Sequence, residues 1–362
     1  MASIDQALTR GQRAEAGRIL RELLERPHLD ADTLLKAGLL FAQQDSYDDA
    51  TQAFARCARD YPKVFEGHYN LALTDFALQK YPEALAALEG PAASSQQQEV
   101  ARQYLRGKVE AALGRARDAQ SDLEAAYAQA PNEENYALDL GLFYLRQGLY
   151  AKAAEVFEKA GQANPSSPYL GLGLSLALFQ LGNYARCIAA CRHLLQLQPD
   201  FSPAWLMLAF ALGLDGKWEE AEKVAAQGLA APSPHPYLYY FHVSLLLKLH
   251  STDYGRLLSE LAIAEQGIPV CSLCALAESK IHQAQGNIPR AIVDLERAVK
   301  LDPNSAEACY RLALLYERAG RPQDAELARA RHSQLKTQEA DREAETLRQV
   351  FMQSLAGPES PR

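Results

Sequence analysis

Two cysteines three residues apart are the strongest candidates for chemistry in this sequence. Cys271 and Cys274 form a C-x-x-C motif at the start of a predicted helix, where the helix dipole lowers the pKa of a thiol. A zinc site needs about four ligands, and no second C-x-x-C motif or nearby histidine pair supplies the others. A thiol-dependent ligand-binding or enzyme-associated role therefore stays open as an alternative hypothesis.

The other polar residues match no catalytic or cofactor-binding motif. The sequence has no glycine-rich phosphate loop and no G-x-S-x-G, H-E-x-x-H or D-x-D-type pattern. Its eight histidines are scattered without acids at fixed helical spacing, so we interpret them as surface, capping or structural residues. Four further cysteines occupy small or apolar packing positions: Cys57, Cys187, Cys191 and Cys309. We predict a non-enzymatic protein with no catalytic residue, metal or cofactor.

The charge and the apolar segments limit the classes of partner. The formal net charge is −8 and no basic run occurs, which argues against nucleic acid or an anionic membrane as the main partner. No apolar segment approaches the roughly 18 residues needed to span a bilayer, and the start of the sequence lacks the apolar core of a signal peptide. We predict a soluble cytoplasmic protein. A periplasmic location is the alternative, if an upstream leader was removed.

The elements that would position any site are visible in the stretch from Tyr136 to Pro165. An apolar helix is predicted up to Arg146, and Gly148 ends it with a left-handed turn. A second helix follows at once, with Ala153 and other apolar residues at steps of three and four, until Pro165 stops it. A hairpin of this size cannot bury both of its faces alone, so it needs a similar neighbour.

The same hairpin recurs along the chain. Pro131, Pro165 and Pro199 are each 34 residues apart. The turn glycine recurs as Gly114, Gly148, Gly182, Gly216, Gly286 and Gly320, with Asp45, Gln79 and His250 in its place elsewhere. The small residue that opens the second helix recurs as Ala50, Ala84, Ala119, Ala153, Ala221, Ala291 and Ala325, with Cys187 there once.

This pattern resembles the tetratricopeptide repeat, a 34-residue helix-turn-helix with small, aromatic and proline residues at set offsets. The resemblance implies an all-α solenoid of stacked hairpins that form a right-handed superhelix. About nine repeats are expected over 31–339, which begin near Ala31, Phe65, Val100, Glu134, Pro168, Ser202, Pro236, Ser272 and Ala306. The seventh repeat departs most from the pattern, and its register is predicted only to within about two residues.

The two ends depart from the repeat. Residues 1–30 are interpreted as an N-terminal capping hairpin or half repeat, and a chain that has lost upstream residues is the alternative. A C-terminal capping helix is predicted over 340–356, followed by a disordered tail over 357–362. The apolar stripe of this helix consists of Leu347, Val350, Phe351 and Leu355. We expect the stripe to dock on the last repeat. Dimerisation and occupation of the chain's own groove are the alternatives, so a monomer or weak dimer is predicted.

The family resemblance also implies that the first helices of the repeats line a concave side. Family members that bind a partner's C-terminal carboxylate use a set of lysines, asparagines and arginine there, of which only Asn70 is matched. The expected lining is apolar instead, and the predicted peptide-binding groove consists of Leu73, Phe76, Tyr104, Leu142, Leu145, Leu176, Phe179 and Phe210. The alternative is that these residues pack first helix against first helix.

These observations favour a scaffold or adaptor that binds a polypeptide segment in an apolar groove. The rivals are the thiol-dependent role of Cys271 and Cys274 and an exported, chaperone-like component of the bacterial envelope. The partner and pathway are not predicted, because repeat arrays of one architecture serve unrelated functions.

Overall fold

The computed structural model describes residues 2–268, 270–335 and 342–356, and these residues form helices and short connections without any strand. The protein is an all-α solenoid of helix-turn-helix hairpins, and its chain divides into two compact units. The N-terminal unit covers 1–147 and the C-terminal unit begins at Gly148. Among the described residues, no helix has both the length and the apolar character to cross a membrane.

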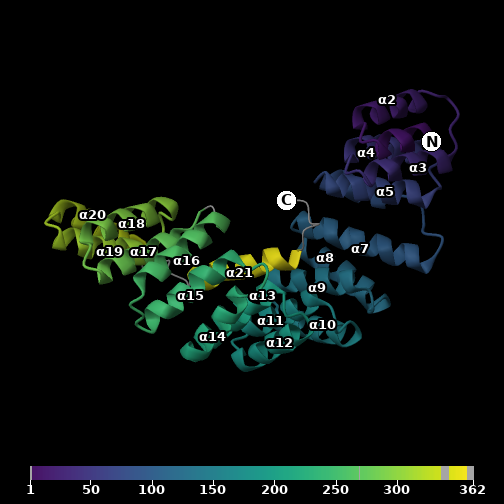
Figure 1. Ribbon diagram of the computed structural model, residues 1–362. Helices are drawn as coiled ribbons and strands as arrows, with labels where there is room; N and C mark the ends of the chain where they lie inside the picture. Colours follow the sequence, from purple (N-terminus) through teal and green to yellow (C-terminus); the bar gives the residue numbers. More distant parts are fainter. Residues whose placement is uncertain (1, 269, 336–341, 357–362) are drawn as a thin grey trace. The chain divides into compact units, whose positions relative to one another are not determined.

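The helices alternate along the chain as first and second helices of the repeats, and the division between the units falls between α9 and α10 (Figure 1). The N-terminal unit contains α1 (Ala2–Thr9), α2 (Arg13–Leu24), α3 (Ala31–Ala42), α4 (Tyr47–Asp60), α5 (Phe65–Ala77), α6 (Tyr81–Leu88), α7 (Gln96–Ala112), α8 (Ala116–Gln129) and α9 (Glu134–Arg146). The C-terminal unit contains α10 (Tyr150–Ala163), α11 (Pro168–Gln180), α12 (Tyr184–Leu197), α13 (Ser202–Leu214), α14 (Trp218–Leu229), α15 (Pro236–Lys248), α16 (Tyr254–Gly267), α17 (Ser272–Ala284), α18 (Ile288–Leu301), α19 (Ala306–Arg318), α20 (Pro322–Leu335) and α21 (Arg342–Ala356).

The turn inside each hairpin has the left-handed geometry that its sequence predicts. Seven turn glycines have φ between 69° and 78°: Gly11, Gly114, Gly148, Gly182, Gly216, Gly286 and Gly320. The three residues that replace the turn glycine adopt the same conformation, with φ of 56° at Asp45 and 59° at both Gln79 and His250. The predicted turn positions are therefore confirmed, including the one in the irregular seventh repeat.

The predicted start of one first helix was wrong. The sequence pattern placed it near Val100, whereas α7 begins four residues earlier, at Gln96. Ser95 accounts for the difference, because its hydroxyl oxygen accepts a hydrogen bond from the backbone N–H of Gln98 at 3.2 Å. This bond satisfies one of the amides that a helix start leaves without a partner, so the helix gains an extra turn ahead of the repeat register.

Small residues allow the helices to approach closely in both units. A β-carbon added to Gly107 on α7 would lie 2.8 Å from Cγ of Leu123 on α8. One added to Gly173 on α11 would lie 2.6 Å from Cζ of Phe157 on α10. Both distances are shorter than real carbon contacts, so neither position tolerates a larger residue without a shift of its neighbour.

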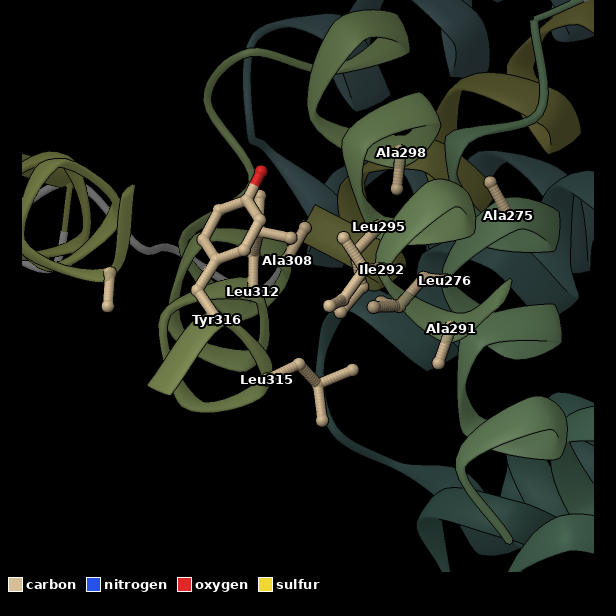
Figure 2. Packing of buried hydrophobic residues seen from close by; sticks show 11 residues of the cluster. Ala275, Leu276, Ala291, Ile292, Leu295, Ala298, Ala308, Leu312, Leu315 and Tyr316 are labelled. Carbon is tan, nitrogen blue, oxygen red and sulfur yellow. The ribbon is translucent and has the colours of Figure 1, made fainter. Parts of the chain in front are cut away.

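Neighbouring hairpins share their apolar cores. Figure 2 shows one such cluster, in which side chains from α17 and α18 meet side chains from α19. Leu276, Leu295 and Leu315 lie in this cluster and are at most 7% exposed. Burial of each such side chain contributes about 1.5–3 kcal/mol, and part of that contribution requires the adjacent hairpin. The N-terminal hairpin is joined in the same way, since Ile4 and Leu20 pack with Phe41 and Phe54.

The C-terminal helix does not pack as expected. We expected α21 to dock on the last repeat, but it packs against α11 and α13, the first helices of two repeats in the middle of the chain (Figure 1). Val350, Phe351 and Leu355 are 7%, 1% and 4% exposed there. The side chain of Leu347 and the predicted tail over 357–362 lie outside the described residues. The expectation of a cap on the last repeat is thus corrected to occupation of the chain's own repeat surface.

Candidate functional site

The first helices of adjacent repeats contact each other within each unit, and an ion pair between Lys280 and Glu307 links the last two, so they form one surface in each unit. We call this surface the first-helix face. In the C-terminal unit it is formed by α11, α13, α15, α17 and α19. In the N-terminal unit it is formed by α3, α5, α7 and α9.

Aromatic side chains connect the first helices of the C-terminal unit. The ring centroids of Phe179 and Phe210 are 5.4 Å apart, and those of Phe210 and Phe241 are 5.2 Å apart. Each ring comes from a different first helix, and each successive ring lies three residues nearer the start of its helix. The first pair is tilted and the second is edge-on, and such aromatic contacts stabilise beyond the burial of area alone.

A cavity of about 460 Å³ lies on this face, over α13, α15, α17 and α19. Its apolar lining includes Phe210, Tyr240, Leu245 and Leu276, and Trp218 contributes from the start of α14. The volume is in the range of sites that hold a few side chains of a ligand.

Cationic side chains lie at the same cavity: Lys248, Lys280 and Arg311. The Nζ atom of Lys248 lies 3.7 Å from the centroid of the Trp218 ring, a cation–π contact. A single carboxylate oxygen of Glu307 lies 3.1 Å from Nζ of Lys280 and 2.8 Å from Nε of Arg311.

The carboxylate of Glu307 therefore pairs with both Lys280 and Arg311, whereas Lys248 contacts the Trp218 ring and has no carboxylate partner among the described residues of this cavity. Burial by itself raises the pKa of Glu307, but Lys280 and Arg311 outweigh that effect and lower it. Glu307 is consequently ionised at neutral pH, and the cavity keeps an excess of positive charge. This local sign is opposite to the net charge of the whole chain.

The first-helix face of the N-terminal unit has a different chemistry. The rings of Tyr104 and Tyr136 lie 4.2 Å apart, and Nζ of Lys108 lies 5.2 Å from the Tyr104 ring and 5.6 Å from the Phe76 ring. Lys108 also forms an ion pair of 2.9 Å with Asp139, which accepts a hydrogen bond from the Tyr104 hydroxyl.

Burial, and then the charge of Asp139, raise the pKa of Tyr104 above its ordinary value, so the hydroxyl stays protonated as a donor. The polar groups of this network are satisfied within the surface itself.

The eight predicted groove residues separate into three groups. Leu73 on α5 is 39% exposed. Phe76 and Tyr104 are half-buried in the network around Lys108. The other five are at most 7% exposed: Leu142, Leu145, Leu176, Phe179 and Phe210. Of the eight, only Phe210 lines the cavity of the C-terminal unit. The cations at this cavity were not predicted, because Lys248, Lys280 and Arg311 stand at a different position in each first helix and so follow no repeat pattern.

Two histidines have acidic partners that the sequence did not reveal. Nδ1 of His242 lies 2.6 Å from a carboxylate oxygen of Glu260, and Nδ1 of His282 lies 2.6 Å from one of Asp294. Each acid comes from the second helix of the same hairpin, so no fixed spacing along one helix shows the pair. His242 is fully buried, which fits a structural role.

The C-x-x-C motif presents no thiol in this structure. Cys271 and Cys274 are joined by a disulfide at the start of α17 and are 5% and 0% exposed. The other four cysteines are buried and free. Within the described ranges, no group of three or more histidine, cysteine or acidic side chains is arranged to hold a metal ion.

Comparison with known families agrees with the repeat geometry. Models described as tetratricopeptide repeats match residues 35–98, 104–168, 172–201 and 280–320, which together make up more than half of the chain. The chain belongs to the tetratricopeptide repeat family. Repeats of this family support protein–protein interaction, and the array here is such a scaffold in its architecture.

The curated relatives share only part of their length with this tetratricopeptide repeat protein. Superkiller complex protein 3 of Mus musculus is 32% identical over 99 residues, which are 27% of this chain and 6% of the relative. The human antiviral innate immune response effector IFIT1 is 25% identical over 204 residues, 49% of this chain and 43% of the relative. The chain thus spans less than half the length of both.

Solved structures support the same fold. The C-terminal part of a tetratricopeptide repeat-containing protein from Cytophaga hutchinsonii superposes with a TM-score of 0.50 at 15% identity. The match covers 76% of this chain and 97% of that one. At this identity the likeness extends to the fold alone.

Proposed function

We propose that this protein is a non-enzymatic scaffold whose first-helix face in the C-terminal unit binds a polypeptide segment that carries both apolar side chains and carboxylates. The observation that supports this most is the cavity over α13, α15, α17 and α19, where an aromatic lining meets Lys248, Lys280 and Arg311. Apolar side chains of a partner would fill the cavity, and its carboxylates would pair with the excess positive charge.

Peptide selection and tryptophan fluorescence test the proposal. The chain has two tryptophans, and only Trp218 lines the cavity. In a Trp205→Phe background, peptides selected from a random displayed library should change the emission of Trp218 on binding. Selected sequences should combine aromatic or aliphatic residues with Asp or Glu.

Matched charge variants identify the surface. Lys280→Met removes a cavity cation but keeps an unbranched side chain, and it should weaken binding of an acidic peptide about fivefold, as expected for one partly exposed charge pair. Lys223→Met makes the same change on an exposed position of α14 away from the cavity, so it should leave binding unchanged. Equal loss from both variants would mean that the cavity is not the binding site.

A single-stranded oligonucleotide in the same assay tests the predicted exclusion of nucleic acid. Binding of the oligonucleotide at the cavity, with no peptide enriched by selection, would overturn the proposal. A negative oligonucleotide result together with peptide binding supports it.

A further inference from the structure

The helix α21 packs on the first-helix face of the C-terminal unit and shares one helix, α13, with the cavity. It packs on α11 and α13, and Phe351 and Leu355, four residues apart on one side of α21, are almost fully buried. Val350 and Ser354 border a hollow that is also lined by Tyr169 and Phe201. An amphipathic helix therefore lies along the repeats with its apolar side toward them.

The two first helices under α21 are the ones that carry no charge. The sequences of α11 and α13 contain no Asp, Glu, Lys or Arg, whereas α9, α17 and α19 each carry several. A helix without a polar side needs cover on every side. The neighbouring repeats cover most of α11 and α13, and α21 covers the side that the stack leaves open. Without α21, a contiguous apolar surface would face water.

We propose that the surface on α11 and α13 is a docking site for an amphipathic helix, that α21 is its resident occupant, and that a partner helix of the same kind displaces α21 in order to bind. This inference rests on the proposed function of the first-helix face. Both sites use α13: its later part contributes Phe210 to the cavity, and its start contributes Pro203 to the hollow beside α21.

The covalent connection sets how strongly α21 competes. A tethered segment reaches an effective concentration on the order of 1 mM at its site. If an untethered copy binds with a Kd of about 10 μM, the tether reduces the apparent affinity of an external helix by about 100-fold. The tethered α21 thus prevents weak ligands from binding. A partner helix displaces it when additional contacts at the cavity raise the partner's affinity.

A labelled synthetic peptide of residues 342–356 is the probe, and the full-length chain is the receptor. The Phe351→Asp change in the chain places a charge on the apolar side of α21 and should release it, because a buried charge without a partner is strongly unfavourable. The Phe351→Asp chain should then bind the peptide about 100-fold more tightly than the wild-type chain, as measured by fluorescence anisotropy. A peptide with the same substitution should bind neither chain.

A second variant and a measurement of helix content control for unfolding caused by the substitution. Leu355→Asp should act like Phe351→Asp, and circular dichroism should show that both retain the helical array. Adding Tyr169→Ser to the Phe351→Asp chain should weaken binding of the peptide, since Tyr169 borders α21. The proposal is overturned if neither released chain binds the peptide, or if the wild-type chain binds it as tightly as they do.

Measuring the oligomeric state tests the remaining alternative, in which α21 of a second copy fills the site. A wild-type chain that is a dimer by light scattering, and becomes a monomer with Phe351→Asp, would show that the helix of a second copy fills the site, and the proposal would fail. Salt separates this inference from the proposed function. Binding at the uncharged α11–α13 surface should be nearly insensitive to ionic strength, whereas binding at the cationic cavity should weaken as salt rises. The failure of this inference and the failure of the proposed function can therefore be distinguished.

Discussion

The first-helix faces of the two units are built from the same repeat, but they differ in how the side that the stack leaves open is stabilised. In the N-terminal unit, Lys108 and Asp139 form an ion pair beside the tyrosines, and this network satisfies its own polar groups. In the C-terminal unit, α11 and α13 have no charged residue, and a segment from the end of the chain covers them. The repeat therefore determines the spacing of the helices, while the residues on the open side determine whether the surface is self-sufficient.

Both units contain a glycine that lets two helices pack closely, and replacing it with a larger residue should cause the largest loss of stability among the changes considered. Gly173→Val forces a side chain into Phe157, and Gly107→Val forces one into Leu123, so each should destabilise its own unit by about 3 kcal/mol. Urea unfolding followed by circular dichroism measures the loss. Gly161→Ala is the control, because an added β-carbon there meets open space and should stabilise α10 by up to about 1 kcal/mol. Unchanged stability in Gly173→Val would contradict the packing described here.

A pH-dependent difference should distinguish the covered surface. His235 lines the hollow beside α21, and its Nδ1 accepts a hydrogen bond from the backbone N–H of Tyr237 at 3.3 Å. Burial lowers the pKa of His235 to about 4 from an ordinary value of 6.5. Because the unfolded chain takes up this proton first, the stabilisation is complete above pH 6.5 and is lost as the pH falls through this window to about 4.

The expected loss at His235 is about 2 kcal/mol, smaller than the full shift implies because the ring is not completely buried. His235→Asn keeps an acceptor at the start of α15 but does not titrate, so its stability should fall less than that of the wild type between pH 7 and pH 4.5. Urea unfolding at the two pH values measures this. Parallel losses in the two proteins would show that His235 is not responsible.

A double-mutant cycle can measure how much the Lys108–Asp139 ion pair stabilises the N-terminal face. Lys108→Met, Asp139→Asn and the double variant should give a coupling energy of about 0.5–1 kcal/mol for this partly exposed pair. Asparagine retains an acceptor for the Tyr104 hydroxyl, so the cycle isolates the charge. A coupling near zero would show that the tyrosines, and not the ion pair, make this face stable.

The smallest effect should come from the turns that lack glycine. Gln79 has φ of 59°, which disfavours a side chain with a β-carbon, so Gln79→Gly should stabilise the N-terminal unit by about 0.5–1 kcal/mol. Gly114→Ala in the same unit is the opposite change and should destabilise it by a similar amount. His250→Gly makes the corresponding test in the C-terminal unit. Thermal unfolding measures both effects. A lower melting temperature for Gln79→Gly together with a higher one for Gly114→Ala would contradict the argument that a positive φ strains a residue with a β-carbon.

Much of the fold follows from local rules and was predictable. The starts of eight first helices, such as α11 at Pro168 and α19 at Ala306, agree with the predicted residues, because the residues that cap these helices, such as Ser167 and Ser305, are adjacent to them in sequence. The start of α7 was missed because Ser95 is a local cap outside the repeat pattern.

The surfaces were less predictable, because they depend on contacts between residues far apart in the chain. An apolar stripe on α21 shows that the helix needs a partner but does not say which one. Leu145 and Leu176 were expected in a groove, yet both are 1% exposed, since an apolar residue on a first helix can face either the groove or a neighbouring helix. The missing charges on α11 and α13 were the available signal for the position of α21.

The long separation in sequence between α21 and the helices that it covers has a consequence for biosynthesis. The ribosome completes α11 and α13 well before it makes Arg342–Ala356, and at ordinary rates of synthesis the delay is on the order of ten seconds. During that interval the side of α11 and α13 that α21 later covers is exposed, and it offers an apolar surface to chaperones or to other nascent chains. Premature termination anywhere between α14 and α20 would leave this surface bare for the lifetime of the fragment, so truncated products should be prone to aggregation and rapid proteolysis.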